Sequence, residues 1–507
     1  MAPHAPPHAP LSPDQAADLR RLFFRIFPAV GLAMFGAALD QTIVASALPA
    51  IARSLGEVER ISWVVVAYLV GTTVAAPVHG RLGDAFGRRR MLLVSLALYA
   101  GGAMLCAVAP TLDLLAAARL VQGLGGGGLI SLSVALIGEF VPPRERGRFQ
   151  AWIAAVFAAA SAFGPVAGGL LTELAGWRAV FLVQPPLALL AAWLAVRRLG
   201  GASPGSASGF AFDWKGLLLF VLFVAPSLLA LDQVRRMSPD ALMVAGGLGA
   251  VALAALALLW RQEKRARDPL LPLPVLGEPS IWRANLCSAL VSGAFVGSIA
   301  FLPIYFAAVR GLSPAAAGLA LLPLAAAAAI GAMAAGQLLA RTGRTMLWST
   351  IGLVGAALVM AGVAASAGGL PVPVVALLLG LVSVGLGASF PMVQIVVQSA
   401  AGRERLGAAT ASVQFIRSLG AASGTALMGT VLFGALVAQA PREGADAAAL
   451  FVALVNEGPE ALAGLTETAR AAFRAGMVDA FRAAFLVAAA MLAGAAWLSA
   501  RVPLQRV

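Results

Sequence analysis

The chain has 507 residues, of which 60% are hydrophobic and 12% charged, and its mean hydropathy is +0.89. A soluble protein of this size would carry about twice that charged fraction, so the composition excludes an ordinary soluble enzyme and predicts a polytopic membrane protein. The formal net charge of +13 does not indicate nucleic-acid binding, because the basic residues fall in short loops between apolar runs.

The sequence gives no sign of a bound cofactor. It lacks a glycine-rich phosphate loop that ends in Lys followed by Ser or Thr, and its only lysines are Lys215 and Lys264. Its three histidines do not cluster with Cys, Asp or Glu at metal-ligand spacing. We therefore expect no cofactor, no metal and no ATP, and an ion gradient as the energy source of any transport.

The chain divides into four parts. Residues 1–20 are rich in Pro and Ala and are expected to form a disordered cytoplasmic tail rather than a cleaved signal peptide. Residues 21–198 hold six apolar runs and are predicted to form a first six-helix bundle. Residues 199–270 combine a Gly/Ser-rich linker with two inserted spans. Residues 271–507 are predicted to form a second six-helix bundle, with an extracytoplasmic loop at 438–478.

The predicted fold class is all-α. Each apolar run is long enough to cross a bilayer as a helix, which gives two six-helix bundles plus two inserted central helices. The fourteen predicted transmembrane helices lie near residues 24–48, 62–80, 91–110, 113–138, 148–172, 178–196, 214–232, 240–260, 281–307, 313–338, 346–366, 372–398, 406–437 and 479–500.

The distribution of basic residues predicts the orientation in the membrane. With the N-terminus inside, 24 of the 36 Lys and Arg residues fall in cytoplasmic segments. Cytoplasmic loops generally carry such an excess, so we expect a multi-pass protein of the cell (inner) membrane with both termini cytoplasmic.

The two halves repeat a pattern of residues at a fixed offset of 256 positions. Such a repeat is typical of a duplicated transporter half, although recurrence by chance is the alternative, because the chain has 55 glycines. The repeated pairs are Gly80 and Gly336, Gly87 and Gly343, Arg88 and Arg344, Gly164 and Gly420, and Gly168 and Gly424.

Asp40 lies within the first apolar run, where an ionisable group is costly and is by default a functional candidate. Arg119 lies at a similar depth in the fourth run, and at roughly 1.5 Å per residue both are about 10–14 Å below the outer surface. We predict that the two side chains pair, with Gln122 on the same face as Arg119. A fixed salt bridge that only assembles the bundle is the alternative.

Arg417 lies near mid-membrane in the thirteenth run, with Gln414 one turn away. Two interpretations stay open: Arg417 faces a substrate cavity, or it bonds backbone carbonyls and holds helices together.

The loop after the second run combines glycines, which permit a tight turn, with arginines. Asp84 is expected to cap a nearby helix N-terminus, where an anion is favoured. Arg88 is expected to pair with Glu139 at the end of the fourth run, the alternative being solvated charges at the interface. The glycines of this loop are Gly80, Gly83 and Gly87.

At these motifs the sequence resembles the major facilitator superfamily, and within it the fourteen-span drug:proton antiporters of the EmrB/QacA type. Residues 39–49 resemble the span-1 motif, 80–90 the gating motif and 115–126 the span-4 motif. The fourth stretch looks like the antiporter signature of span 5, with Gly164, Pro165, Gly168 and Gly169. There are also departures from the family pattern, at Ala45, Ala151, Ala160, Ala307 and Ala340.

The resemblance implies alternating access by two bundles, with the loop at 80–90 and Glu139 as the inner gate. Asp40 and Arg119, chosen for their depth, are the candidate proton-coupling residues, and Gln122, Gln414 and Arg417 are the candidate cavity residues.

The implied function is proton-coupled export of hydrophobic or amphipathic drug-like compounds. The partners would be a small lipophilic substrate, protons and the lipid bilayer, with no nucleic acid, and the involvement of a periplasmic adaptor protein is left open. The alternatives are a dedicated exporter of one metabolite, lipid or siderophore, or a symporter. A non-transporting scaffold is disfavoured by the embedded Asp40, and no enzymatic activity is expected.

Overall fold

The structure is a computed structural model. It is all-helical in the part that it describes, as the sequence predicts. An isolated β-bridge between Arg344 and Arg506 is the one extended pairing in this part. The described residues are 13–55, 60–200, 210–234, 239–266, 269–270, 276–312, 314–402, 405–439, 467–504 and 506.

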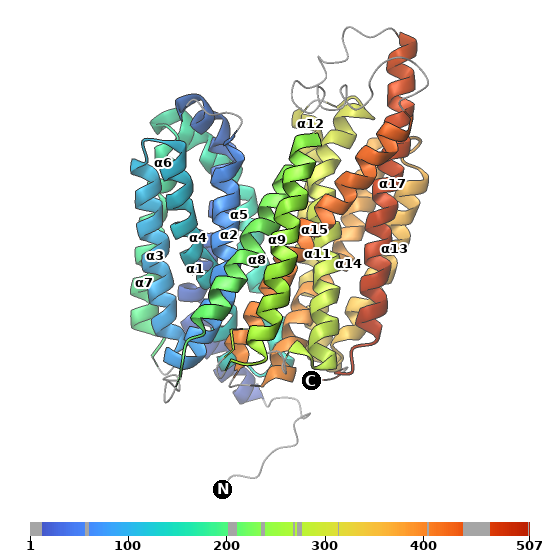
Figure 1. The fold of residues 1–507 in the computed structure, drawn as a ribbon. Helices are drawn as coiled ribbons and strands as arrows, with labels where there is room; N and C mark the ends of the chain where they lie inside the picture. Colours follow the sequence, from blue (N-terminus) through green and yellow to red (C-terminus); the bar gives the residue numbers. More distant parts are fainter. Residues whose placement is uncertain are drawn as a thin grey trace.

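The first bundle occupies the left side of Figure 1 and contains two helices, α6 and α7, that share one apolar run. This run breaks at Val183, because Pro185 and Pro186 have no N–H to donate to the preceding turn. The helices are α1 (Pro13–Leu55), α2 (Ser62–Phe86), α3 (Arg88–Val108), α4 (Leu112–Phe140), α5 (Pro143–Ala175), α6 (Arg178–Leu182) and α7 (Gln184–Arg198).

The second bundle lies on the right of Figure 1, with an inserted hairpin in front of the junction. The hairpin is α8 (Trp214–Val234) and α9 (Pro239–Glu263). It joins both bundles, because α8 packs against α2 and against α15, where the ring of Phe220 lies 4.9 Å from that of Phe415. The bundle itself comprises α11 (Pro279–Ala308), α12 (Pro314–Thr342), α13 (Met346–Ala365), α14 (Val372–Ala401), α15 (Leu406–Gln439) and α17 (Glu467–Ala500).

Thirteen helices in the described residues are long and apolar enough to cross a membrane, with α6 and α7 counted as one, against fourteen in the prediction. The fifth predicted span, α5, is not among them, although it has 33 residues and packs against α1 and α12. The start of α1 and the end of α17 lie at the same end of the molecule (Figure 1), which requires an even number of passes. A pass by α5 satisfies that requirement, so the fourteenth span stays a prediction.

Two predicted boundaries differ from the structure. Helix α1 begins at Pro13, so residues 13–20 are helical rather than part of a disordered tail. Proline fits the first helical position, because the N–H that it lacks has no partner within the helix there. Helix α17 begins at Glu467, within the predicted outer loop. The rest of the tail, the linker at 201–209 and residues 440–466 lie outside the described residues.

The offset of 256 residues relates equivalent places in the two bundles. Gly87 ends α2 with a φ of 94°, and Gly343 follows α12 with a φ of 66°. Gly164 faces α1, the first helix of its bundle, as Gly420 faces α11. We call the end of the molecule where α2 meets α3 the Gly87 end.

Candidate functional site

Asp40 of α1 and Arg119 of α4 form a fully buried ion pair. Their exposed fractions are 0% and 1%. The Nη1 of Arg119 donates to both carboxylate oxygens of Asp40, at 2.8 and 2.7 Å, and its Nε donates to the carbonyl of Val64 at 3.2 Å. The contact that the two depths predicted is therefore present.

Two glutamines complete this group, which we call the Asp40 cluster: Asp40, Arg119, Gln122 and Gln184. Gln122 donates to Asp40 Oδ1 at 3.1 Å and accepts from Arg119 Nη1 at 2.7 Å. Gln184 donates to the same Oδ1 at 2.9 Å and accepts from the Nε2 of Gln122. Gln122 is fully buried and lies on the same face as Arg119, as predicted, and its place in a substrate cavity stays a prediction.

Gln184 was not predicted from the sequence. It is the first residue of α7, directly after the break at Val183, and its side chain reaches Asp40 on α1. A visible signal was a polar residue inside the apolar run, in front of Pro185 and Pro186. The direction of the side chain depends on how the broken helix docks, which the sequence pattern alone does not give.

Aromatic rings shield the ion pair. The guanidinium carbon of Arg119 lies 4.1 Å from the ring centre of Tyr68 and 5.8 Å from that of Phe181. Both rings are fully buried. Because a buried ion pair in apolar surroundings is strongly coupled, loss of the charge on Asp40 would leave Arg119 uncompensated. The geometry can therefore link protonation of Asp40 to a rearrangement of the cluster.

The span-5 motif packs on α1 just beyond Asp40. A Cβ on Gly164 would overlap Thr42, and one on Gly168 would overlap Ser46. The hydroxyl of Thr42 also donates to the carbonyl of Ala160 at 3.1 Å. Gly169 has no neighbour within 4 Å of its Cβ position, so it makes no close contact here. Pro165 lies inside α5, which continues through it.

Asp84 joins the two bundles at the Gly87 end. Its carboxylate accepts from the backbone N–H groups of Gly407 and Ala408 in the first turn of α15, each at 3.1 Å. Arg88 donates to Asp84 and to Glu139, both at 2.7 Å. The expected helix cap and the expected Arg88–Glu139 pair are both present, and together they connect α4, α2, α3 and α15.

Glycines allow this junction to close. A Cβ on Gly80 would lie 2.6 Å from the carbonyl oxygen of Gly407, so the backbones of α2 and α15 nearly touch. A Cβ on Gly83 would lie 2.6 Å from Leu132 of α4. Gly80 therefore allows close packing between the two bundles, and Gly83 allows it within the first bundle. Gly87, with its positive φ, forms the turn between α2 and α3.

A second contact between the bundles at this end was not predicted. Arg146 of α5 donates to the side chain of Gln398 of α14 at 3.3 Å. It also donates to the carbonyls of Gly138 and Val141, at 2.5 and 2.9 Å. In the described residues, Asp84 and Arg146 thus both contribute hydrogen bonds that join the two bundles at the Gly87 end.

Arg417 of α15 contacts Gln414 and Phe390 rather than backbone carbonyls. Its Nη2 donates to Gln414 Oε1 at 2.6 Å, and its guanidinium carbon lies 5.5 Å from the ring centre of Phe390 on α14. All three side chains are half-buried. Within the described part of the chain, no hydrogen bond joins Arg417 to a backbone carbonyl.

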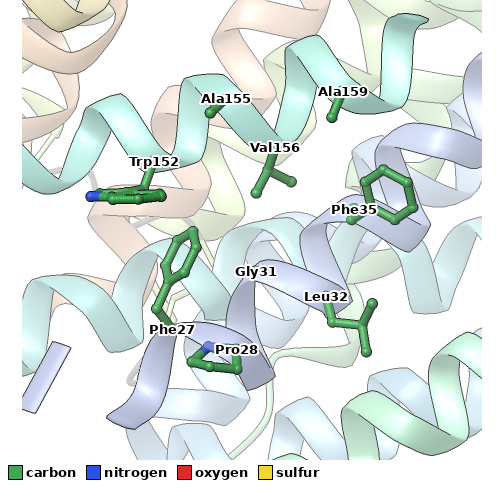
Figure 2. A pocket seen from close by; sticks show the side chains of 9 residues that line it. All are labelled: Phe27, Pro28, Gly31, Leu32, Phe35, Trp152, Ala155, Val156 and Ala159. Carbon is green, nitrogen blue, oxygen red and sulfur yellow. The ribbon is translucent and has the colours of Figure 1, made fainter. Parts of the chain in front are cut away.

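A groove of about 340 Å³ lies between α1 and α5 (Figure 2). Phe27 and Phe35 line it from α1, and Trp152 and Val156 from α5. Its lining side chains are apolar, and none of the predicted site residues is among them. The groove is therefore distinct from the Asp40 cluster.

The geometry of two repeated bundles around a closed end agrees with a family-level match. The sequence model of the Major Facilitator Superfamily matches residues 30–425. The chain belongs to this superfamily. Members of this superfamily are transporters rather than enzymes, and the chain is a multi-span membrane protein of this type.

Relatives carry transporter names. The chain is 33% identical to an uncharacterised MFS-type transporter of Mycobacterium tuberculosis over 407 residues, which cover 80% of this chain and 59% of that protein. It is 28% identical to the multidrug transporter protein MdtP of Bacillus subtilis, over 79% of this chain and 74% of that one. The chain thus spans less than two thirds of the mycobacterial relative.

The fold also matches solved transporters. The human organic anion transporter MFSD10 superposes with a TM-score of 0.62 at 17% identity, covering 94% of this chain and 99% of that one. Identity at this level supports the fold alone.

Proposed function

We propose that this chain is a proton-coupled antiporter that exports hydrophobic or amphipathic drug-like compounds by alternating access. The Asp40 cluster carries the proposal, because a carboxylate with 0% exposure inside a membrane-spanning bundle is costly and functional by default. MdtP, which matches this chain over about three quarters of its own length, is named a multidrug transporter, and this supports export of drug-like compounds.

The Gly87 end is the cytoplasmic end in this proposal. The excess of Lys and Arg in the loops at this end supports that orientation. The protein then lies in the cell (inner) membrane with both termini on the cytoplasmic side. The structure then corresponds to a state closed toward the cytoplasm through Asp84 and Arg146.

In the proposed cycle, a proton reaches Asp40 from the outside and weakens its contact with Arg119. The freed arginine then favours a different arrangement of α1 and α4, and the bundles rock about their interface. The proton leaves toward the cytoplasm when Asp40 pairs with Arg119 again. Substrate crosses on the opposite half-cycle.

Everted membrane vesicles test this function. Respiration acidifies their interior, so a proton antiporter should accumulate a lipophilic monocationic dye such as ethidium inside them. Accumulation should stop when a protonophore removes the gradient. Accumulation equal to that of vesicles without the protein, or unaffected by the protonophore, would contradict the proposal.

A further inference from the structure

The two arginines embedded in the membrane region differ in their partners. Arg119 is fully buried and bonded to Asp40. In the described residues Arg417 has only Gln414 and the ring of Phe390 as partners, and both are uncharged. Its positive charge therefore has no anion beside it.

Among the side chains that the structure describes, no carboxylate contacts Arg417. The sequences of α14 and α15 contain neither Asp nor Glu. Helices α2 and α4 pack against α15, and their acidic residues form ion pairs with other arginines. Asp84 and Glu139 pair with Arg88. Asp113 pairs with Arg60. An unbalanced guanidinium in a low-dielectric region is costly, so an anionic ligand would be strongly favoured there.

Arg417 can reach such a ligand. A guanidinium has five N–H donors, and one nitrogen of Arg417 is engaged, by Gln414. The side chain is half-buried, as are Phe390 and Gln394 on the facing side of α14. Together they form a partly open face, which we call the Arg417 face: Phe390, Gln394, Gln414, Arg417 and Ser418.

We propose that Arg417 and Gln414 bind the anionic group of a lipophilic monoanion, such as an amphipathic carboxylate, with Phe390 against its apolar part. This deepens the proposed export function, on which it rests, by naming a further substrate class beside lipophilic monocations. The guanidinium suits a carboxylate because it can donate two parallel N–H bonds. Arg417 lies eleven residues after the start of α15, or roughly 16 Å along the helix, which is deeper than lipid phosphates sit.

Binding to the full-length protein in phosphatidylcholine nanodiscs tests this proposal. The probes are pyrene butyrate and pyrene butanol, which share one apolar body, and the signal is energy transfer from tryptophan, corrected with empty nanodiscs. The wild-type protein should bind the carboxylate at least about tenfold more tightly than the alcohol. Equal affinity would overturn the proposal without any variant.

Variants then locate the preference. Arg417→Gln should remove it, Arg417→Lys should retain part of it, and Arg482→Gln, at an exposed arginine of α17, should leave it unchanged. Each variant is compared by its melting temperature. A preference that survives in folded Arg417→Gln would overturn the proposal, as would displacement of pyrene butyrate by phosphatidylglycerol in the nanodiscs.

The binding assay needs no proton gradient, so the two proposals fail separately. A charge preference at Arg417 without proton-driven dye transport would remove the proposed coupling and keep the anion site. Proton-driven dye transport without a charge preference at Arg417 would remove the anion site and keep the proposed coupling.

Discussion

The carboxylate of Asp84 in the first bundle accepts a hydrogen bond of 3.1 Å from the backbone N–H of Ala408 in the second. An anion at a helix N-terminus satisfies free N–H groups and interacts favourably with the helix dipole. A side chain of one bundle thus caps a helix of the other, and the cap exists only while the Gly87 end is closed. The closed state is therefore stabilised by the hydrogen bonds of Asp84 to α15, in addition to apolar contacts between the bundles.

Asp84→Asn should shift the population toward the state that is open at the Gly87 end. Asparagine removes the negative charge and one of the two oxygens that accept from Gly407 and Ala408. The loss of one hydrogen bond, about 1 kcal/mol, corresponds to roughly a fivefold change in the ratio of the two states. Spin labels at Arg90→Cys and Arg341→Cys, both exposed at this end and one in each bundle, would report the distance distribution. The native cysteines are buried, so the labels should attach at the introduced sites.

The matched control is Asp113→Asn, which removes a carboxylate that pairs with Arg60 in an exposed ion pair at the opposite end. It should leave the distances unchanged. Equal shifts from both variants, or none from Asp84→Asn, would show that the cap does not hold the closed state.

Gly80→Leu should block closure at the Gly87 end while the protein still folds. Even the first side-chain carbon at this position would lie 2.6 Å from the carbonyl oxygen of Gly407, so α2 and α15 would have to separate. We expect dye export in vesicles to fall at least about tenfold at equal expression. The control is Gly101→Leu on α3, where no atom lies within 4 Å of the Cβ position, and it should retain export. Similar losses from both would mean that the effect is not specific to closure.

The ion pair between Asp40 and Arg119 could be predicted because depth in a span follows from counting residues along a helix. That Asp84 caps a helix N-terminus could be predicted, because an anion is favoured there. Which helix it caps could not be predicted, since α15 belongs to the other bundle. Gln184 and the Arg146–Gln398 contact could not. The first depends on how α7 docks after Val183, and the second joins residues 252 apart that meet only when the bundles close.

Gln184→Leu should lower proton-driven transport. The leucine removes one of the donors to Asp40 Oδ1 and the acceptor of the Gln122 Nε2 donor, so the Asp40 cluster loses part of its geometry. The loss of one buried hydrogen bond, about 1 kcal/mol, corresponds to roughly a fivefold lower rate. Proton-driven dye transport in vesicles at equal expression checks this. Gln262→Leu, which removes a similar donor to Asp213 on the inserted hairpin, should leave transport unchanged; an equal loss there, or none in Gln184→Leu, would contradict the role of Gln184.

Divalent cations should be poor substrates. The Asp40 cluster offers one carboxylate, and Arg119 and Arg417 add positive charge in the membrane region. A second positive charge on the substrate would lack a partner and would meet a desolvation cost of several kcal/mol. Ethidium and propidium share one ring system and differ in charge, so their transport in the same vesicles at one membrane potential should differ at least about tenfold. Equal proton-driven rates would contradict this count of charges.

Proton movement through Asp40 is the central claim, and it can be measured directly in proteoliposomes that contain a pH-sensitive dye. With the wild-type protein, adding a transported substrate to one side should move protons in the opposite direction, and the pH change should start with substrate flux. Asp40→Asn keeps the size of the side chain and its contacts with Gln122 and Gln184, but it cannot carry a proton. We predict that this variant folds and still binds substrate, but produces no substrate-dependent proton flux. A proton flux equal to that of the wild type, at equal protein content, would show that Asp40 is not the coupling group.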